Sequence, residues 1–146
     1  MLDKLKLSVG NLVILAAGVV MVLSSLLPFL KAAPVHGGPV SSTVWSNGFL
    51  GIATLPVLLG AVMAGQVGLA AFATRVKVPE HVLGLAWDQI HLTLAAQAVL
   101  LMLSWLAVDR AEFNQGRQLG FWVMLLAAIG LMAGAVLRVR EPQPVS

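Results

Sequence analysis

Ionisable residues gather at one point of an otherwise apolar chain. Asp88 and His91 are three residues apart, so in a helix their side chains would be neighbours on one face. His81 precedes Asp88 by seven residues, which is two helical turns along the same stripe, and Glu80 lies beside it. These four residues are expected to form one ionisable strip. Such a strip could conduct protons, contribute to a divalent-metal site or contact a charged segment of a partner.

The same residues also have a structural interpretation. An Asp–His pair near the end of a helix can satisfy its own hydrogen bonds and those of the helix terminus without any further role. A metal site would be incomplete, because one helix face rarely supplies enough ligands. The chain has no Cys, and His91 is the only histidine within a predicted membrane span, so a haem held by two histidines is not expected. The sequence therefore predicts no metal, no cofactor and no catalytic constellation.

Composition places these residues in a membrane protein. Hydrophobic residues make up 59% of the 146 residues and charged residues 10%, whereas a soluble domain has about 25% charged residues. Disorder is excluded because it requires low hydrophobicity and high charge. The net charge is +3, but the basic residues occur in short groups between apolar runs. Nucleic-acid binding needs them clustered on one face, so it is not expected.

Four apolar stretches are long enough to cross a bilayer, which takes about 20 residues. They are expected to be helices in an all-α polytopic membrane protein, a single membrane domain with four transmembrane helices in an up-down bundle. The third helix is expected to start near Pro79, and the first outer loop to contain no strand or helix. The predicted spans are 11–30, 49–74, 83–108 and 119–137, with outer loops 31–48 and 109–118 and inner loop 75–82.

The basic residues predict the orientation, because cytoplasmic loops are enriched in Lys and Arg. With both termini in the cytoplasm, the inner side carries twice as many basic residues as the outer side. The inner set is Lys4, Lys6, Arg75, Lys77, Arg138 and Arg140, and the outer set is Lys31, Arg110 and Arg117. Trp45, Trp105 and Trp122 then fall at the outer interface and Trp87 near the inner one.

Small residues at a spacing of four predict close helix packing. The small residues form one ridge at Gly60, Ala64 and Gly68, a parallel ridge at Ala61 and Gly65, and a GxxxG motif at Gly130 and Gly134. Packing within the monomer is the expected use, with a dimer interface as the alternative. Buried amides such as Gln66 are expected to form hydrogen bonds between helices.

Two short segments carry a resemblance. The run Leu27-Pro28-Phe29-Leu30 and the run Val44-Trp45-Ser46-Asn47-Gly48 frame a turn-rich loop. In this the chain resembles the small four-span membrane proteins of actinobacteria, most of them uncharacterised. The resemblance implies the same helical fold and brings no functional residues with it.

Three functions remain open. The leading hypothesis is a non-enzymatic accessory or scaffold subunit of a bacterial envelope complex. It would lie in the inner (cell) membrane, and its partners would be the lipid bilayer and another membrane protein or a second copy. The alternative is a small oligomeric transporter or proton-coupled carrier that uses Asp88 and His91. The third is a membrane-embedded enzyme or cofactor protein.

Overall fold

The part of the chain that the structure describes is mainly helical. The computed structural model describes residues 8–28, 30–32, 40–42, 45, 51–73, 75, 77–107 and 119–141. Within them lie four helices: α1 (Val9–Ser24), α2 (Gly51–Phe72), α3 (Trp87–Ala107) and α4 (Leu119–Arg140). The predicted outer loop 109–118 and much of the loop 31–48 lie outside the described residues.

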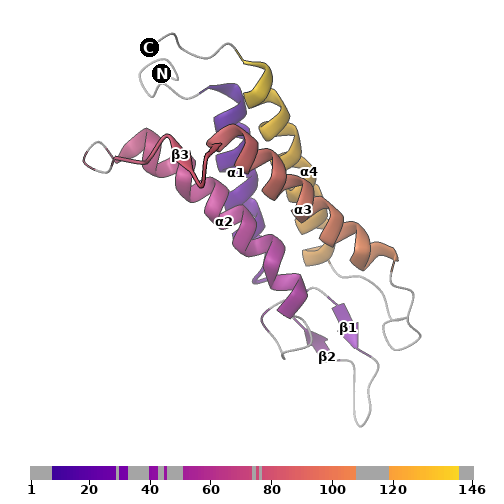
Figure 1. Ribbon diagram of the computed structural model, residues 1–146. Coiled ribbons are helices and arrows are strands. Elements are labelled where there is room, and N and C mark those ends of the chain that lie inside the picture. The colour runs from indigo at the N-terminus through magenta and orange to yellow at the C-terminus, as the bar shows by residue number, and fades with distance from the viewer. Residues whose placement is uncertain are drawn as a thin grey trace.

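The helices alternate in direction (Figure 1). At one end of the helical body, here called the Arg138 end, α1 and α3 begin and α2 and α4 end; the other is called the Trp122 end. α1 packs most extensively against α4 and α2, and α3 packs against the same two helices, so that each helix has two main neighbours. Residues near positions 10, 66, 90 and 138 are therefore brought together towards the Arg138 end.

The core consists of apolar side chains from all four helices. Ile14, Met63, Met102 and Phe121 are fully enclosed. The outward faces are apolar as well, since large side chains such as Leu126 are more than half exposed. A helix that is apolar all round is either the core of a large protein or a membrane span.

Among the described residues, two helices are long and apolar enough to cross a membrane by length and composition. They are α2, over Thr54–Phe72, and α4. In each of these two helices, less than half of the apolar stretch is buried inside the protein, 39% in α2 and 44% in α4. α1 is apolar but has 16 residues, which corresponds to about 24 Å, short of the roughly 30 Å of a bilayer core. α3 begins with polar residues, among them Asp88 and His91, which lower its hydropathy. Two of the four predicted spans therefore meet the criterion.

The expectation that the first outer loop holds no strand is wrong. β1 (Leu30–Ala32) pairs with β2 (Val40–Ser42) in an antiparallel arrangement at the Trp122 end, with Lys31 opposite Ser41. Two short segments separated by Gly and Pro residues are also the pattern of a β-hairpin. Trp45 contacts the end of α1, where its indole N–H donates to the hydroxyl oxygen of Ser25 at 2.9 Å.

The expectation that the third helix starts near Pro79 is also wrong. A second hairpin, β3 (His81–Val82) paired with β4 (Leu85–Ala86), precedes α3. Its turn residues Leu83 and Gly84 both have positive φ, 54° and 81°, which is typical of a type I′ turn. Gly84 adopts this conformation without strain, and a turn there separates Pro79 from the helix.

Two hydrogen bonds place the start of α3 after this hairpin. The indole N–H of Trp87 donates to the carbonyl oxygen of Pro79 at 2.7 Å. The Ala86 N–H donates to Oε1 of Gln89 at 3.3 Å. The hairpin is thereby held against the first turn of α3, so that α3 begins at Trp87.

Candidate functional site: a polar cluster at the Arg138 end

The second hairpin divides the expected ionisable strip. Glu80 and His81 lie before α3 and are exposed, so they do not share a helix face with Asp88. Asp88 and His91 are both on α3, in its first turn and a half. The prediction of one continuous strip is wrong, and only the Asp88–His91 half is placed on a common helix. An acidic residue in the first turn of a helix also interacts favourably with the helix dipole.

Arg138 of α4 contacts both Asp88 and His91. Its Nε lies 2.5 Å from Oδ1 of Asp88, and its Nη1 lies 3.1 Å from Nδ1 of His91. The two charged side chains are largely withdrawn from solvent, with 18% of Arg138 and 24% of Asp88 exposed. One guanidinium therefore joins both ionisable residues of α3 to α4.

The contact with Arg138 fixes the protonation of His91. A guanidinium only donates hydrogen bonds, so Nδ1 of His91 must be the acceptor and the ring is neutral, with its proton on Nε2. His91 is fully buried, and its Nε2 has no hydrogen-bond partner among the described residues. The ring also makes an edge contact with Trp87, with centroids 5.8 Å apart. The Nε2–H group is thus a buried donor with unused capacity.

Gln66 brings a third helix to the same guanidinium. Nη1 of Arg138 donates to Oε1 of Gln66 across 3.5 Å, a long and weak hydrogen bond. Gln66 is buried on α2. Its bond to α4 agrees with the expectation that buried amides form hydrogen bonds between helices. We call Gln66, Asp88, His91 and Arg138 the polar cluster. It links α2, α3 and α4.

α1 is fastened close to the polar cluster through its first turn. The Gly10 N–H donates to Oε1 of Glu141 at 2.8 Å, and the Ser8 hydroxyl oxygen accepts the Asn11 N–H at 3.2 Å. Both bonds satisfy N–H groups that the helix itself leaves free. Oδ1 of Asn11 is buried and has no hydrogen-bond partner within the described part of the chain.

Sequence reasoning missed Arg138 as a member of the site, because it was counted only among the cytoplasmic basic residues. A usable signal was present. Asp88 stands at the start of the third apolar stretch and Arg138 at the end of the fourth, and antiparallel neighbours bring such positions to one end. A charge inside one helix should prompt a search for the opposite charge at the matching depth of the next.

The chemistry open to this arrangement is narrow. Arginine keeps its proton in proteins, so Arg138 holds a permanent charge that the Asp88 carboxylate neutralises. No group of three or more His, Cys, Asp or Glu side chains suited to a metal ion occurs among the described residues. The geometry is that of an ion pair with an attached neutral imidazole. Within it, Nε2–H of His91 is a buried donor without a hydrogen-bond partner among the described residues.

Small residues allow α2 and α4 to approach α1 closely on its two sides. We call these close contacts along α1 the seam. A methyl group added to Gly18 would lie 2.5 Å from Cβ of Ala64 and 2.7 Å from the Gly60 carbonyl oxygen. The small residues of α4 face the other side of α1. A methyl group on Gly134 would lie 2.8 Å from Cγ1 of Ile14, and one on Gly130 would lie 3.1 Å from Cβ of Ala17.

The ridge of Gly60 and Ala64 and the GxxxG motif of Gly130 and Gly134 thus pack inside the protein, whereas the predicted parallel ridge of Ala61 and Gly65 does not. Gly68 has more room, with Cδ1 of Leu15 at 3.9 Å from the site of an added methyl group. The sequence reasoning did not single out Gly10 and Gly18, which are the matching small positions on α1.

One pair of small residues is not used in this way. Ala61 and Gly65 lie one turn apart on α2 and are exposed, and a methyl group on Gly65 would meet no atom within 4 Å. Small residues on an outward apolar face allow another helix to approach closely.

Comparisons with known proteins identify no relative of this chain. No family model, no curated protein and no solved structure matches this chain.

Proposed function

We propose that this protein is an integral membrane protein with four spanning helices in an up-down bundle and both termini in the cytoplasm. Exposed large apolar side chains on the outward faces of α1, α2, α3 and α4 support insertion. They include Leu23, Leu58, Leu100 and Leu126. α1 is short for a span, and a bilayer accommodates such a helix by local thinning.

Charge and aromatic residues support the orientation. Arg75, Lys77, Arg138 and Arg140 lie at the Arg138 end, while Lys31 lies at the Trp122 end. Trp105 and Trp122, near the end of α3 and the start of α4, stand at the Trp122 end, and Trp87 at the other. Basic residues on the cytoplasmic side and Trp residues at both interfaces are typical of membrane proteins.

Within that membrane, the protein acts as an accessory or scaffold subunit of a bacterial envelope complex. The observation that carries this proposal is the exposed Ala61–Gly65 pair on α2, which the seam leaves unused. Without a hydrophobic driving force between helices in lipid, close backbone approach is what joins membrane subunits. A partner helix would pack across Gly65.

Purification from native membranes in a gentle detergent tests this role. The expected result is a second membrane protein at constant stoichiometry, identified by native gel and mass spectrometry. Gly65→Leu should release that protein, whereas Ala70→Leu, an exposed position on another side of α2, should retain it. A homo-oligomer without any second protein would overturn the accessory role.

The alternative function is a proton-coupled carrier. It is favoured by one observation, the buried Nε2–H of His91 beside the Asp88–Arg138 ion pair. The combined variant Asp88→Asn, Arg138→Gln removes both charges and leaves no unpaired charge behind. If proton-coupled flux in liposomes is lost in this variant while folding and partner binding persist, the carrier function is correct. If wild-type protein shows no flux, it is excluded.

A further inference from the structure

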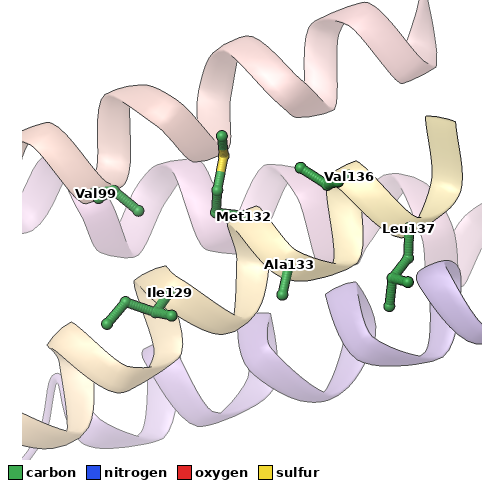
Figure 2. A pocket seen from close by; sticks show the side chains of 6 residues that line it. All are labelled: Val99, Ile129, Met132, Ala133, Val136 and Leu137. Carbon is green, nitrogen blue, oxygen red and sulfur yellow. The ribbon is translucent and has the colours of Figure 1, made fainter. Parts of the chain in front are cut away.

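An apolar groove runs along the outer surface between α3 and α4 (Figure 2). Its volume is about 530 Å³, which is within the size range of small-molecule sites, roughly 300–1,000 Å³. It is lined by Val99 of α3 and by Ile129, Met132, Ala133, Val136 and Leu137 of α4. No polar side chain is among these lining residues.

The α4 side of the groove ends in a positive charge. Ile129, Ala133 and Val136 follow one another on successive turns, and Arg140 comes four residues after Val136. Positions spaced by four, seven and eleven residues share one face of an α-helix, so Arg140 continues the stripe that lines the groove. The groove is therefore apolar along its length and basic at the Arg138 end.

Arg140 differs from its neighbour Arg138 in its partners. Arg138 is committed to Asp88 and His91, whereas Arg140 is exposed and forms no ion pair among the described residues. A basic residue at the cytoplasmic end of a membrane helix can bind the phosphate of a lipid headgroup.

We propose that the groove binds an acyl chain of an anionic phospholipid, with Arg140 binding the lipid phosphate. The proposal rests on the membrane insertion proposed above. Charge complementarity selects an anionic headgroup, since the groove leads from apolar side chains to a guanidinium that forms no ion pair within the described part of the chain. The groove suits a flexible chain better than a helix, because large exposed side chains, Ile129 and Leu137, stand on its surface. Helices approach each other closely over small residues instead.

Native mass spectrometry of the full-length protein in mixed micelles tests the proposal. The micelles contain equal amounts of phosphatidylglycerol, which is anionic, and phosphatidylcholine, which is zwitterionic. The wild-type protein should retain phosphatidylglycerol preferentially. Arg140→Gln should lower this preference about fivefold, while Arg75→Gln, which removes an exposed basic residue at the same end, should leave it unchanged. Equal losses in the two variants would indicate diffuse charge attraction and overturn the proposal.

A second pair of variants tests the groove itself. Ala133→Phe places a ring in the groove, and since Ala133 is exposed the fold should tolerate it. This variant should retain less of both lipids, whereas Ala70→Phe, at an exposed position of α2, should not. Unchanged lipid retention in Ala133→Phe would overturn the assignment of the chain to the groove.

Photocrosslinking identifies the occupant in native membranes. A benzoylphenylalanine in place of Leu137, a large side chain that already lines the groove, should give adducts with the mass of a phospholipid. An adduct with the mass of a protein would overturn the proposal in favour of a partner helix. Extraction of wild-type membranes with alkaline carbonate separates this outcome from failure of the proposed insertion. Protein that stays in the washed membranes yet shows no lipid preference contradicts only the groove proposal.

Discussion

The seam along α1 and the polar cluster at the Arg138 end hold neighbouring helices together by different means. In the seam, Gly10, Gly18 and Gly134 have no side chains, and the helix backbones come into contact. In the polar cluster, Arg138 reaches three side chains on two other helices. The seam therefore depends on distances that a single methyl group would disturb. The cluster depends on matching charge and hydrogen-bonding groups, so its members are best tested in combination.

The seam should show the largest effect of a single substitution. A methyl group in Gly10→Ala would lie 2.7 Å from the backbone nitrogen of Arg138 and 2.9 Å from the Gly134 carbonyl oxygen. Backbone atoms cannot move aside by a change of rotamer, so α1 and α4 must separate. We expect a loss of about 3 kcal/mol in the free energy of unfolding, measured by SDS titration of helicity in detergent micelles.

Gly65→Ala is the matched control for Gly10→Ala. No atom lies within 4 Å of the added methyl group, so the substitution should stabilise α2 by about 0.5–1 kcal/mol through helix propensity. If both variants lost stability equally, close packing at the seam would not be the reason that Gly10 is needed.

The ion pair should show the next largest effect. Asp88→Asn leaves Arg138 in a largely buried position without its carboxylate, and we expect a loss of about 2 kcal/mol in the same titration. Adding Arg138→Gln should recover part of this loss because no charge is then left unpaired. A double variant less stable than the sum of the two single variants would contradict the pairing of these residues.

The amide contact should show the smallest effect. Gln66→Leu removes the 3.5 Å hydrogen bond to Arg138, and hydrogen bonds between membrane helices average about 0.6 kcal/mol. The expected change in the free energy of unfolding is of that size. A loss as large as that of Asp88→Asn would place Gln66 at the centre of the polar cluster instead of its edge.

The two hairpins show why parts of the structure escaped sequence reasoning. Pro79 followed by Glu80 is a good helix start, and this local signal led to the expected strip with His81. Two residues with positive φ at Leu83 and Gly84 provide a competing local structure. The hydrogen bond from the indole N–H of Trp87 to the carbonyl oxygen of Pro79, eight residues earlier, favours the hairpin.

The sequence by itself determined the helical class, the approximate helix ranges and the small residues that permit close packing, because hydropathy and residue size act locally along the chain. It also marked Asp88 and His91 as neighbours on one helix face. Only the tertiary structure decided that Arg138 is their partner, that both glycine ridges face α1, and that Gly65 stays open. These are relations between helices far apart in the chain, and a local pattern carries no information about which helix packs against it.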